Sequence, residues 1–408
     1  MRLAILGLAS AGLADAFTPS LHAPSLPTAR SHASLGLSTA PSALKIRPTG
    51  RSARSSAVPM QMGLSARHAG ALAAVVPRTL ASQNPVTVAA GLAAVLVGVL
   101  YVLLKIPSRA YKDGEGTVGK EYDAWTEEGL LEYYWGEHIH LGYYDEDDRK
   151  AVMNPLKSSK VFKDTKYKFI EEMYKWSGAD KPAKVLDVGC GIGGTSRYLA
   201  NKLGDDSTVT GITLSPKQVE RATALAKERD LNNVDFRVMD ALKMEFEDNT
   251  FDLVWACESG EHMPDKRKYI EEMSRVLKPG GTLVVATWCQ KEGDITPSEQ
   301  KDLNFLYEEW AHPYFVSYEE YGRLMKGTGK MEQVREENWV KETITAWRHS
   351  IWVGVWDPWI VIWKGLTTRA GPMLWWKTIR EIVTLNRMHK AFESGLMTYG
   401  MITAKKTA

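Results

Sequence analysis

Short apolar runs alternate with helical patterns between residues 183 and 288. Runs of strand length and apolar composition occupy 183–188, 208–213, 234–238, 251–257 and 282–288. Patterns typical of helices lie between them at 194–203, 216–229 and 266–277, and Ser215 stands where the second of these helices needs an N-cap. Strands that alternate with helices predict an α/β fold, a parallel Rossmann-like sheet with helices on both faces.

The chain before this region has the pattern of targeting sequence. Residues 1–16 carry an early Arg2, an apolar run and a small-x-small ending, which are typical of a signal peptide. Residues 17–85 contain no acid and are rich in Ser, Ala, Pro and Arg, which predicts a disordered, plastid transit-like leader. The two segments together resemble two-part targeting to secondary plastids and so predict a plastid location. A secretory signal followed by a disordered linker is the alternative.

One apolar segment follows the leader. Residues 86–104 contain no charge, and as a helix they would span roughly 28 Å, close to the hydrocarbon thickness of a bilayer. Arg78 and Lys105 flank the segment. We therefore expect a single transmembrane anchor. The alternative, a second signal region that is cut off, lacks a small-x-small motif after it.

The charge distribution and the cysteine content argue against several classes of protein. Residues 1–112 carry eleven Lys or Arg and one acid, whereas the remainder carries 40 basic and 48 acidic residues. The mildly acidic body argues against nucleic acid as a partner, because a phosphate-binding domain needs a basic face. Three cysteines are too few for a disulfide scaffold or a thiolate zinc cluster.

A glycine-rich turn follows the first strand and is the main functional signal. It has the pattern Asp-x-Gly-x-Gly-x-Gly, and its expected cofactor contacts are Asp187, Gly189, Cys190, Gly191 and Gly193. A turn of this kind lets a ligand approach the backbone. A carboxylate two residues before the first glycine would repel a pyrophosphate but would suit the amino group of a methionine moiety. The pattern favours S-adenosylmethionine over a nicotinamide dinucleotide.

Later strand ends agree with this cofactor. The second strand ends at Thr213-Leu214, with Gln218 close behind, where the fold places a ribose. The third strand is followed by Asp240-Ala241, where an acid can accept from an adenine amino group, although Asp240 alone could equally be a helix cap. In this order the motifs predict a class I methyltransferase.

The motifs VLDVGCGIGGTSRYLA, GITLSPKQ, ESGEHMPDK and LKPGG together resemble the gamma-tocopherol methyltransferase family. The stretch 121–143 and the tail are similar to its branch of cyanobacterial-type 2-methyl-6-phytyl-benzoquinol methyltransferases. The resemblance implies a mostly parallel seven-stranded sheet. It also implies a helical cap at 116–180, a cofactor-binding core at 181–300, and a lid with the last strands at 301–408. The implied reaction is C-methylation of a prenylated hydroquinone, although related branches methylate other acceptors, including alkaloid nitrogen.

The fourth strand leads into the candidate catalytic residues Glu258, Glu261 and His262. A hydroquinone carbon becomes nucleophilic when its phenol loses a proton, so the reaction needs a general base. Ligands sit at the carboxyl ends of the strands in such sheets, which places this segment near the donor methyl group, with Glu258 also near the cofactor. A histidine titrates close to working pH, which suits His262 to the role. The alternative is that Glu261 and His262 only pair or cap a helix.

The resemblance also implies that the segment around 133–144 folds over the donor. Tyr143 and His140 are the expected donor contacts there, and His138 and His140 are expected to contact the acceptor. Structural packing of these aromatic side chains is the alternative. No Cys or Asp near the two histidines completes a ligand set, so we expect no metal. Tyr122 and Trp125 are expected to belong to the core.

Tryptophans dominate the C-terminal region, with nine between residues 305 and 376. Four of them, at 352, 356, 359 and 363, would share one helical face if the helix continued through Pro358. We expect a tryptophan-rich helical lid that rests on the membrane and holds a prenyl tail, with plain packing as the alternative. In addition to His138 and His140, the residues expected to contact the acceptor are Trp288, Trp310, His312 and Trp356.

Three functions remain open from the sequence. The first is a membrane-anchored prenylquinol methyltransferase. The second is the same fold acting on a small soluble acceptor, such as a methylthio-hydroxy acid or an amine. The third, a non-enzymatic donor-binding protein, is disfavoured by the intact glycines and by the Glu258–His262 segment.

Overall fold

The computed structural model describes residues 84–108, 111–112, 116–368 and 371–407. The expected signal peptide at 1–16 and all but the end of the leader at 17–85 lie outside these residues. The chain divides into two units, residues 1–100 and residues 101–408. Helix α3 (Pro85–Leu103) begins in the first unit, and by length and composition its residues Val86–Leu103 could cross a membrane.

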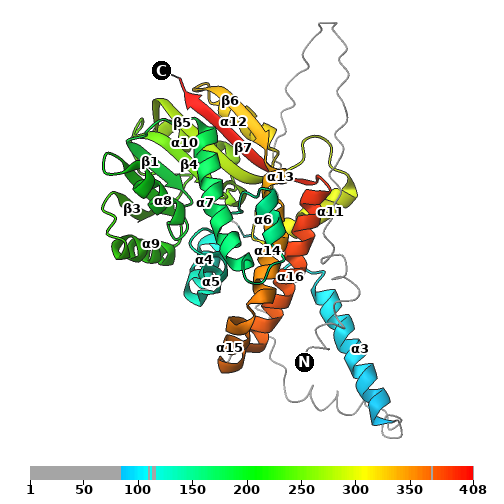
Figure 1. Cartoon of the computed structure of the whole chain (residues 1–408). Helices are drawn as coiled ribbons and strands as arrows, with labels where there is room; N and C mark the ends of the chain where they lie inside the picture. Colours follow the sequence, from blue (N-terminus) through cyan, green and yellow to red (C-terminus); the bar gives the residue numbers. More distant parts are fainter. Residues whose placement is uncertain (1–83, 109–110, 113–115, 369–370, 408) are drawn as a thin grey trace, which may run out of the picture. The chain divides into compact units, whose positions relative to one another are not determined.

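The second unit is built on a seven-stranded sheet with the order β3-β2-β1-β4-β5-β7-β6 (Figure 1). Strands β1 to β5 are parallel, and β7 runs antiparallel to both β5 and β6. This arrangement confirms the mostly parallel Rossmann-like fold. The strands are β1 (Lys184–Val188), β2 (Thr208–Thr213), β3 (Val234–Val238), β4 (Phe251–Cys257), β5 (Leu277–Gln290), β6 (Met331–Asn338) and β7 (Met397–Lys406).

Helices precede, connect and follow these strands. Those before the sheet are α4 (Thr117–Glu128), α5 (Leu130–Trp135), α6 (Glu146–Ala151) and α7 (Ser158–Ser177). Those between β1 and β6 are α8 (Gly194–Leu203), α9 (Pro216–Glu228), the short 3₁₀ helix η3 (Gly260–His262), α10 (Lys266–Val276), α11 (Pro297–Glu309) and α12 (Tyr318–Gly327). Those between β6 and β7 are α13 (Val340–Thr343), α14 (Thr345–Trp356), α15 (Trp359–Thr367) and α16 (Gly371–Glu393).

Alternating strand residues build a core on each face of the sheet. Val185 and Trp255 face one side, where they join a cluster that includes residues of α7, α8, α14 and α16. Leu186 and Val254 face the other side and join a cluster with residues of α10 and α12. Both faces are therefore dry, which explains why these strands are near-continuous apolar runs.

The predicted elements match the structure closely, with two differences. Strand β5 begins at Leu277 instead of 282, because Leu277 pairs with Phe251 before a register shift. The four tryptophans would share one helical face only if the helix continued through Pro358, and it does not, because Pro358 separates α14 from α15. Trp352 and Trp356 stack on α14 with ring centroids 5.3 Å apart, whereas Trp359 and Trp363 lie on α15.

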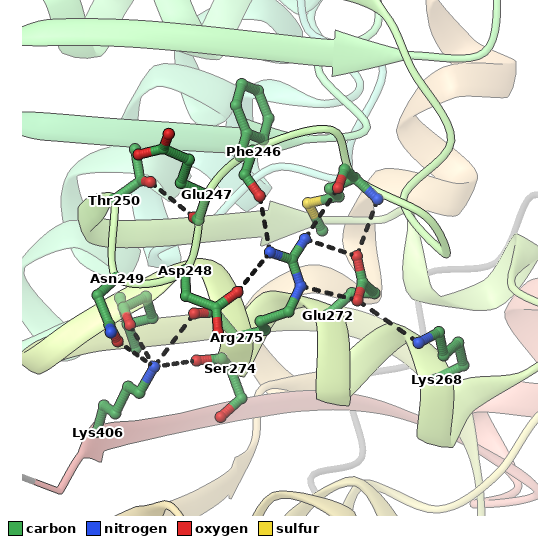
Figure 2. Close-up of polar contacts among 12 residues, drawn as sticks. Phe246, Glu247, Asp248, Asn249, Thr250, Lys268, Glu272, Ser274, Arg275 and Lys406 are labelled. Atoms are coloured by element: carbon green, nitrogen blue, oxygen red, sulfur yellow. Dashed lines mark hydrogen bonds and ion pairs between the residues drawn. The ribbon is translucent and has the colours of Figure 1, made fainter.

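Two cations, partly exposed Arg275 and buried Lys406, fasten the end of the sheet opposite the strand ends that carry the site (Figure 2). Arg275 on α10 donates to the carbonyls of Phe246 and Met244 and pairs with Asp248. Lys406, the last residue of β7, donates to Asn249 Oδ1 and to the carbonyls of Ser274 and Leu277. The final strand thus satisfies orphan carbonyls at the end of α10.

Replacing Lys406 with Met is expected to lower the free energy of unfolding by about 2–3 kcal/mol, because buried carbonyls lose a charged donor. Urea unfolding measures the change. Lys405→Met is the matched control on the neighbouring, more exposed position, with an expected change below about 0.5 kcal/mol. Equal effects in the two variants would contradict this assignment.

Candidate functional site

A cavity of about 520 Å³ lies at the carboxyl ends of β1, β2 and β4. Its walls come from the glycine turn after β1, the turn after β2, residues 239–242, the segment 257–264, and α4. Trp288, Trp310 and His312 line it as expected, together with His138 and His140. Residues from motifs that lie far apart in the sequence therefore line one cavity.

The glycine turn packs closely against neighbouring side chains. Gly189 has φ +85°, and an added Cβ would lie 2.4 Å from the Cβ of Ser259. Gly191 also has positive φ, but an added Cβ there would meet nothing closer than 3.9 Å and would project toward Gln218. Gly193 does not line the cavity: it precedes α8 and leaves room for the ring of Phe236, so its role is packing.

Asp187 lies at the end of β1, buried, and accepts a hydrogen bond of 2.6 Å from Ser196. Burial raises the pKa of its carboxyl to about 6, so it is charged at neutral pH. Cys190, beside it in the turn, also lines the cavity. A buried carboxylate at this position suits a cationic ligand group.

The end of β2 presents an oriented amide. Thr213 Oγ donates to Gln218 Oε1 over 2.7 Å, which leaves Nε2 at the other end of the amide. Gln218 Nε2 is buried without a protein partner, 3.9 Å from the Cβ position of Gly191. Thr213 therefore orients Gln218, which keeps a donor for a ligand hydroxyl. Leu214 lines the same wall.

Asp240 and Ala241 line the cavity after β3. Asp240 Oδ1 accepts from the backbone N–H of Leu242 over 2.8 Å, so this carboxylate also stabilises its own turn. In the described segment between β3 and β4 no helix begins, so the helix-cap alternative is wrong for Asp240. A ligand contact remains open to this carboxylate, because it has further acceptor positions.

Two carboxyl groups, those of Glu258 and Glu261, line the cavity after β4. Glu258 Oε1 accepts from Leu141 N–H and from Tyr399 Oη, both at 2.8 Å, and the residue adopts φ +50°. Glu261 Oε1 accepts from Trp288 N–H at 3.1 Å, and its Oε2 is buried without a partner. Burial raises both pKa values, and repulsion from Glu261 raises that of Glu258 further, to about 8. Such a pair holds a proton near neutral pH and can exchange it.

His262 differs from the expectation. Burial and nearby Lys266 lower the pKa of its imidazole to about 3, so the ring does not titrate near working pH. Its Nε2 lies 3.0 Å from Tyr122 Oη, and its Nδ1 is buried without a partner. The Glu258 and Glu261 carboxyls are therefore better suited to take a proton, and neutral His262 is suited to hydrogen bonding.

Tyr122 is a cavity residue that sequence reasoning assigned to the core. It lies on α4. This helix is fastened to the turn after β2, because Asp123 accepts from Ser215 Oγ at 2.5 Å and from Lys217 N–H at 3.3 Å. Burial raises the pKa of the Tyr122 phenol, so it remains a donor. The signal that could have found it is the resemblance across 121–143, because aromatic periodicity alone does not separate core from site.

The two upstream histidines are buried in the cavity wall. His140 Nδ1 is 2.8 Å from the carbonyl of Leu141, so this nitrogen carries the proton and Nε2 is left as an acceptor without a protein partner. His138 Nδ1 lies 3.4 Å from Thr195 Oγ. Burial lowers both pKa values, so both rings are neutral.

Besides Gly193, the expected contacts Tyr143 and Trp356 lie outside the cavity, and besides Tyr122, the unexpected Trp347 lies inside it. Tyr143 packs its ring on Trp339, with centroids 5.4 Å apart, and lies against the core cluster that includes residues of α7. Trp356 stacks on Trp352 beyond the cavity. Trp347, buried on α14, lines the cavity wall instead of Trp356 and packs against Trp288. Within the described ranges, no cluster of three His, Cys, Asp or Glu side chains suited to a metal is present.

The strand order and the glycine turn define a class I methyltransferase that uses S-adenosylmethionine, and a family model described as a methyltransferase domain matches residues 179–355. A 2-methyl-6-phytyl-1,4-hydroquinone methyltransferase of Synechocystis sp. is 40% identical over 77% of this chain and 95% of the relative. A chloroplastic tocopherol O-methyltransferase of Arabidopsis thaliana is 36% identical over 68% of this chain and 79% of the relative. The chain belongs to this family of phytylhydroquinone and tocopherol methyltransferases.

Solved structures agree on the fold. A geranyl diphosphate C-methyltransferase from Streptomyces coelicolor, solved with S-adenosyl-L-homocysteine, covers 74% of this chain and 100% of its own, with a TM-score of 0.55 and 19% identity. At that identity the likeness shows the fold alone. It confirms that the cavity lies in a methyltransferase architecture.

Proposed function

We propose that the protein C-methylates the ring of a prenylated hydroquinone, 2-methyl-6-phytyl-benzoquinol or gamma-tocopherol, at a plastid membrane where α3 is its anchor. The observation that carries the reaction is the carboxyl pair of half-buried Glu258 and buried Glu261 in an aromatic cavity beside the glycine turn. The relatives named above support the substrate class, and the apolar length of α3 supports the anchor.

The residues around the glycine turn fit S-adenosylmethionine. We assign the amino group of its methionine part to the region of Asp187, the ribose to Gln218, and the adenine to Asp240 and Ala241. The turn formed by Gly189, Cys190 and Gly191 leaves room for the cofactor to approach the backbone. When bound, the cofactor supplies an electrophilic methyl group on a positively charged sulfur.

The acceptor side is assigned to the opposite wall. Glu258 takes the proton of a ring hydroxyl, which makes the ring carbon electron-rich. After methyl transfer Glu258 returns that proton to the ring oxygen, and the methylated carbon gives its hydrogen as a proton to the carboxyl pair, which releases it to solvent, so one proton leaves per turnover. His262 Nδ1–H holds an acceptor oxygen while Tyr122 donates to Nε2. His138, His140, Trp288, Trp310, His312 and Trp347 enclose the ring and exclude water.

An amine acceptor is the second candidate, because a norajmaline N-methyltransferase of Rauvolfia serpentina is 30% identical over 70% of this chain. The test supplies full-length protein in liposomes with S-adenosylmethionine and a mixture of acceptors. The mixture holds 2-methyl-6-phytyl-benzoquinol, gamma-tocopherol, a methylthio-hydroxy acid and an alkaloid amine. Mass spectrometry identifies the methylated compound. Methylation of the acid or the amine alone would overturn the quinol proposal.

Replacing Tyr122 with Phe is expected to lower kcat about tenfold, because His262 loses the hydrogen bond that orients it. The affinity for S-adenosylmethionine, measured by calorimetry, should change less than about twofold, since the ring remains. The matched control Tyr198→Phe removes a hydroxyl that bonds Glu171 outside the cavity, and it should leave kcat unchanged. An unaltered kcat in Tyr122→Phe would show that His262 needs no such support.

A further inference from the structure

Helix α15 and the first half of α16 expose large apolar side chains. Trp359, Trp363 and Leu366 on α15 are 72%, 68% and 70% exposed, far above the core residues of the same body. Figure 1 shows α15 at the end of the α14–α16 hairpin, away from the sheet. We call the exposed set the tip surface; it consists of Trp359, Trp363, Leu366, Met373, Trp375 and Ile379.

The tip surface is held in shape by close helix packing. An added Cβ at Gly365 would lie 2.0 Å from Trp375 Nε1, and one at Gly371 would lie 1.8 Å from the carbonyl oxygen of Gly365. These glycines let α15 and α16 approach closely. The exposed tryptophans therefore belong to a packed helical pair and are presented together.

The segment that carries the tip surface contains no acid. Residues 358–380 contain four basic residues, of which Lys377 is exposed, whereas Arg380 is buried against Glu309 and Lys364 donates to the carbonyl of Glu128. Tryptophan together with Lys and Arg is the composition that the interfacial layer of a bilayer favours, because the rings sit at headgroup depth and the cations meet anionic lipids. A soluble protein partner would have to cover the same rings without that match.

The same helix is tied to the chain that follows α3. Arg380, next to Ile379, donates to the carbonyls of Leu103 and Ile106 at 2.9 and 2.6 Å, and it pairs with fully buried Glu309. Ser108 N–H donates to Glu309 Oε2 at 3.0 Å. The residues directly after the apolar helix are thus fastened to α16. Leu385, further along α16, lines the cavity.

We propose that the tip surface inserts into the interfacial layer of an anionic lipid bilayer, so that an apolar acceptor passes from lipid along α16 to the cavity. The contact goes beyond the proposed reaction, since it does not depend on which acceptor is methylated. An anchor by α3 alone would not require the body to touch lipid.

Tryptophan fluorescence in brominated lipid tests the contact directly. No tryptophan precedes Trp125, so quenching by bromine on the acyl chains reports on the body and not on α3. Full-length protein is reconstituted in vesicles with anionic lipid, with and without brominated chains, and flotation verifies association. We expect quenching in wild type that falls by about half or more in the double variant W359F/W363F.

The control variant W176F removes a tryptophan on α7, outside the tip surface, and should leave the quenching unchanged. Phe at exposed positions keeps the apolar packing, and circular dichroism checks the fold. Unquenched emission from floated wild type, failure to float, or unchanged quenching in the double variant would each overturn the proposal. A second copy or another protein would then be the occupant of the tip surface. Because no readout requires turnover, this result is independent of the acceptor assay.

Discussion

Replacing Glu258 with Gln is expected to lower kcat by about 100-fold or more, because the amide cannot accept the proton of the acceptor hydroxyl. The shape of the side chain and its contact with Leu141 N–H are kept, so cofactor affinity measured by calorimetry should remain within about threefold. A variant that retained more than a tenth of wild-type kcat would remove Glu258 as the base. Glu261→Gln, measured alongside, then shows whether the neighbouring carboxyl carries the role.

The pH dependence follows from the raised pKa. Glu258 is protonated below about pH 8, so its basic form becomes scarcer by about tenfold for each pH unit below that value. We expect log kcat to rise with pH from about 6 to 8 in wild type and to be flat in Glu258→Gln. Tyr399→Phe removes one of two hydrogen bonds that favour the carboxylate, and it should move the rise to higher pH. An unmoved profile in Tyr399→Phe would contradict the role of that hydrogen bond.

Two alanine substitutions in the glycine turn are expected to act on different properties. Gly189→Ala places a methyl group 2.4 Å from Ser259 at φ +85°, so we expect the free energy of unfolding to fall by about 3 kcal/mol. Gly191→Ala has room for its methyl group within the protein but projects it toward Gln218. It should cost only about 1–2 kcal/mol of stability, from the backbone alone, and weaken cofactor binding at least tenfold.

Each variant is the control for the other, since both require positive φ. Urea unfolding without cofactor measures stability, and calorimetry measures affinity for S-adenosylmethionine. The assignment would fail if Gly191→Ala bound the cofactor as wild type does, because the cofactor would then lie away from the turn. It would also fail if the two variants lost the same stability.

The sequence determined the sheet and the cofactor because both depend on local pattern. Buried parallel strands are apolar runs, and a turn that admits a ligand to the backbone needs glycine, so both are legible along the chain. The helix break at Pro358 is also a local feature, and it divides the tryptophans between α14 and α15. Which of their rings are exposed depends on packing against α16, which is tertiary.

The chemistry of the site depended on the tertiary structure. Burial moved the pKa of His262 down and that of Glu258 up, and it reversed the ranking of the two bases. Tyr122 reached His262 across 140 residues, and Thr213 oriented Gln218 by a contact that no motif encodes. The pKa of a group and the direction of its hydrogen bonds depend on which other groups are buried beside it. These neighbours come together only when the chain folds.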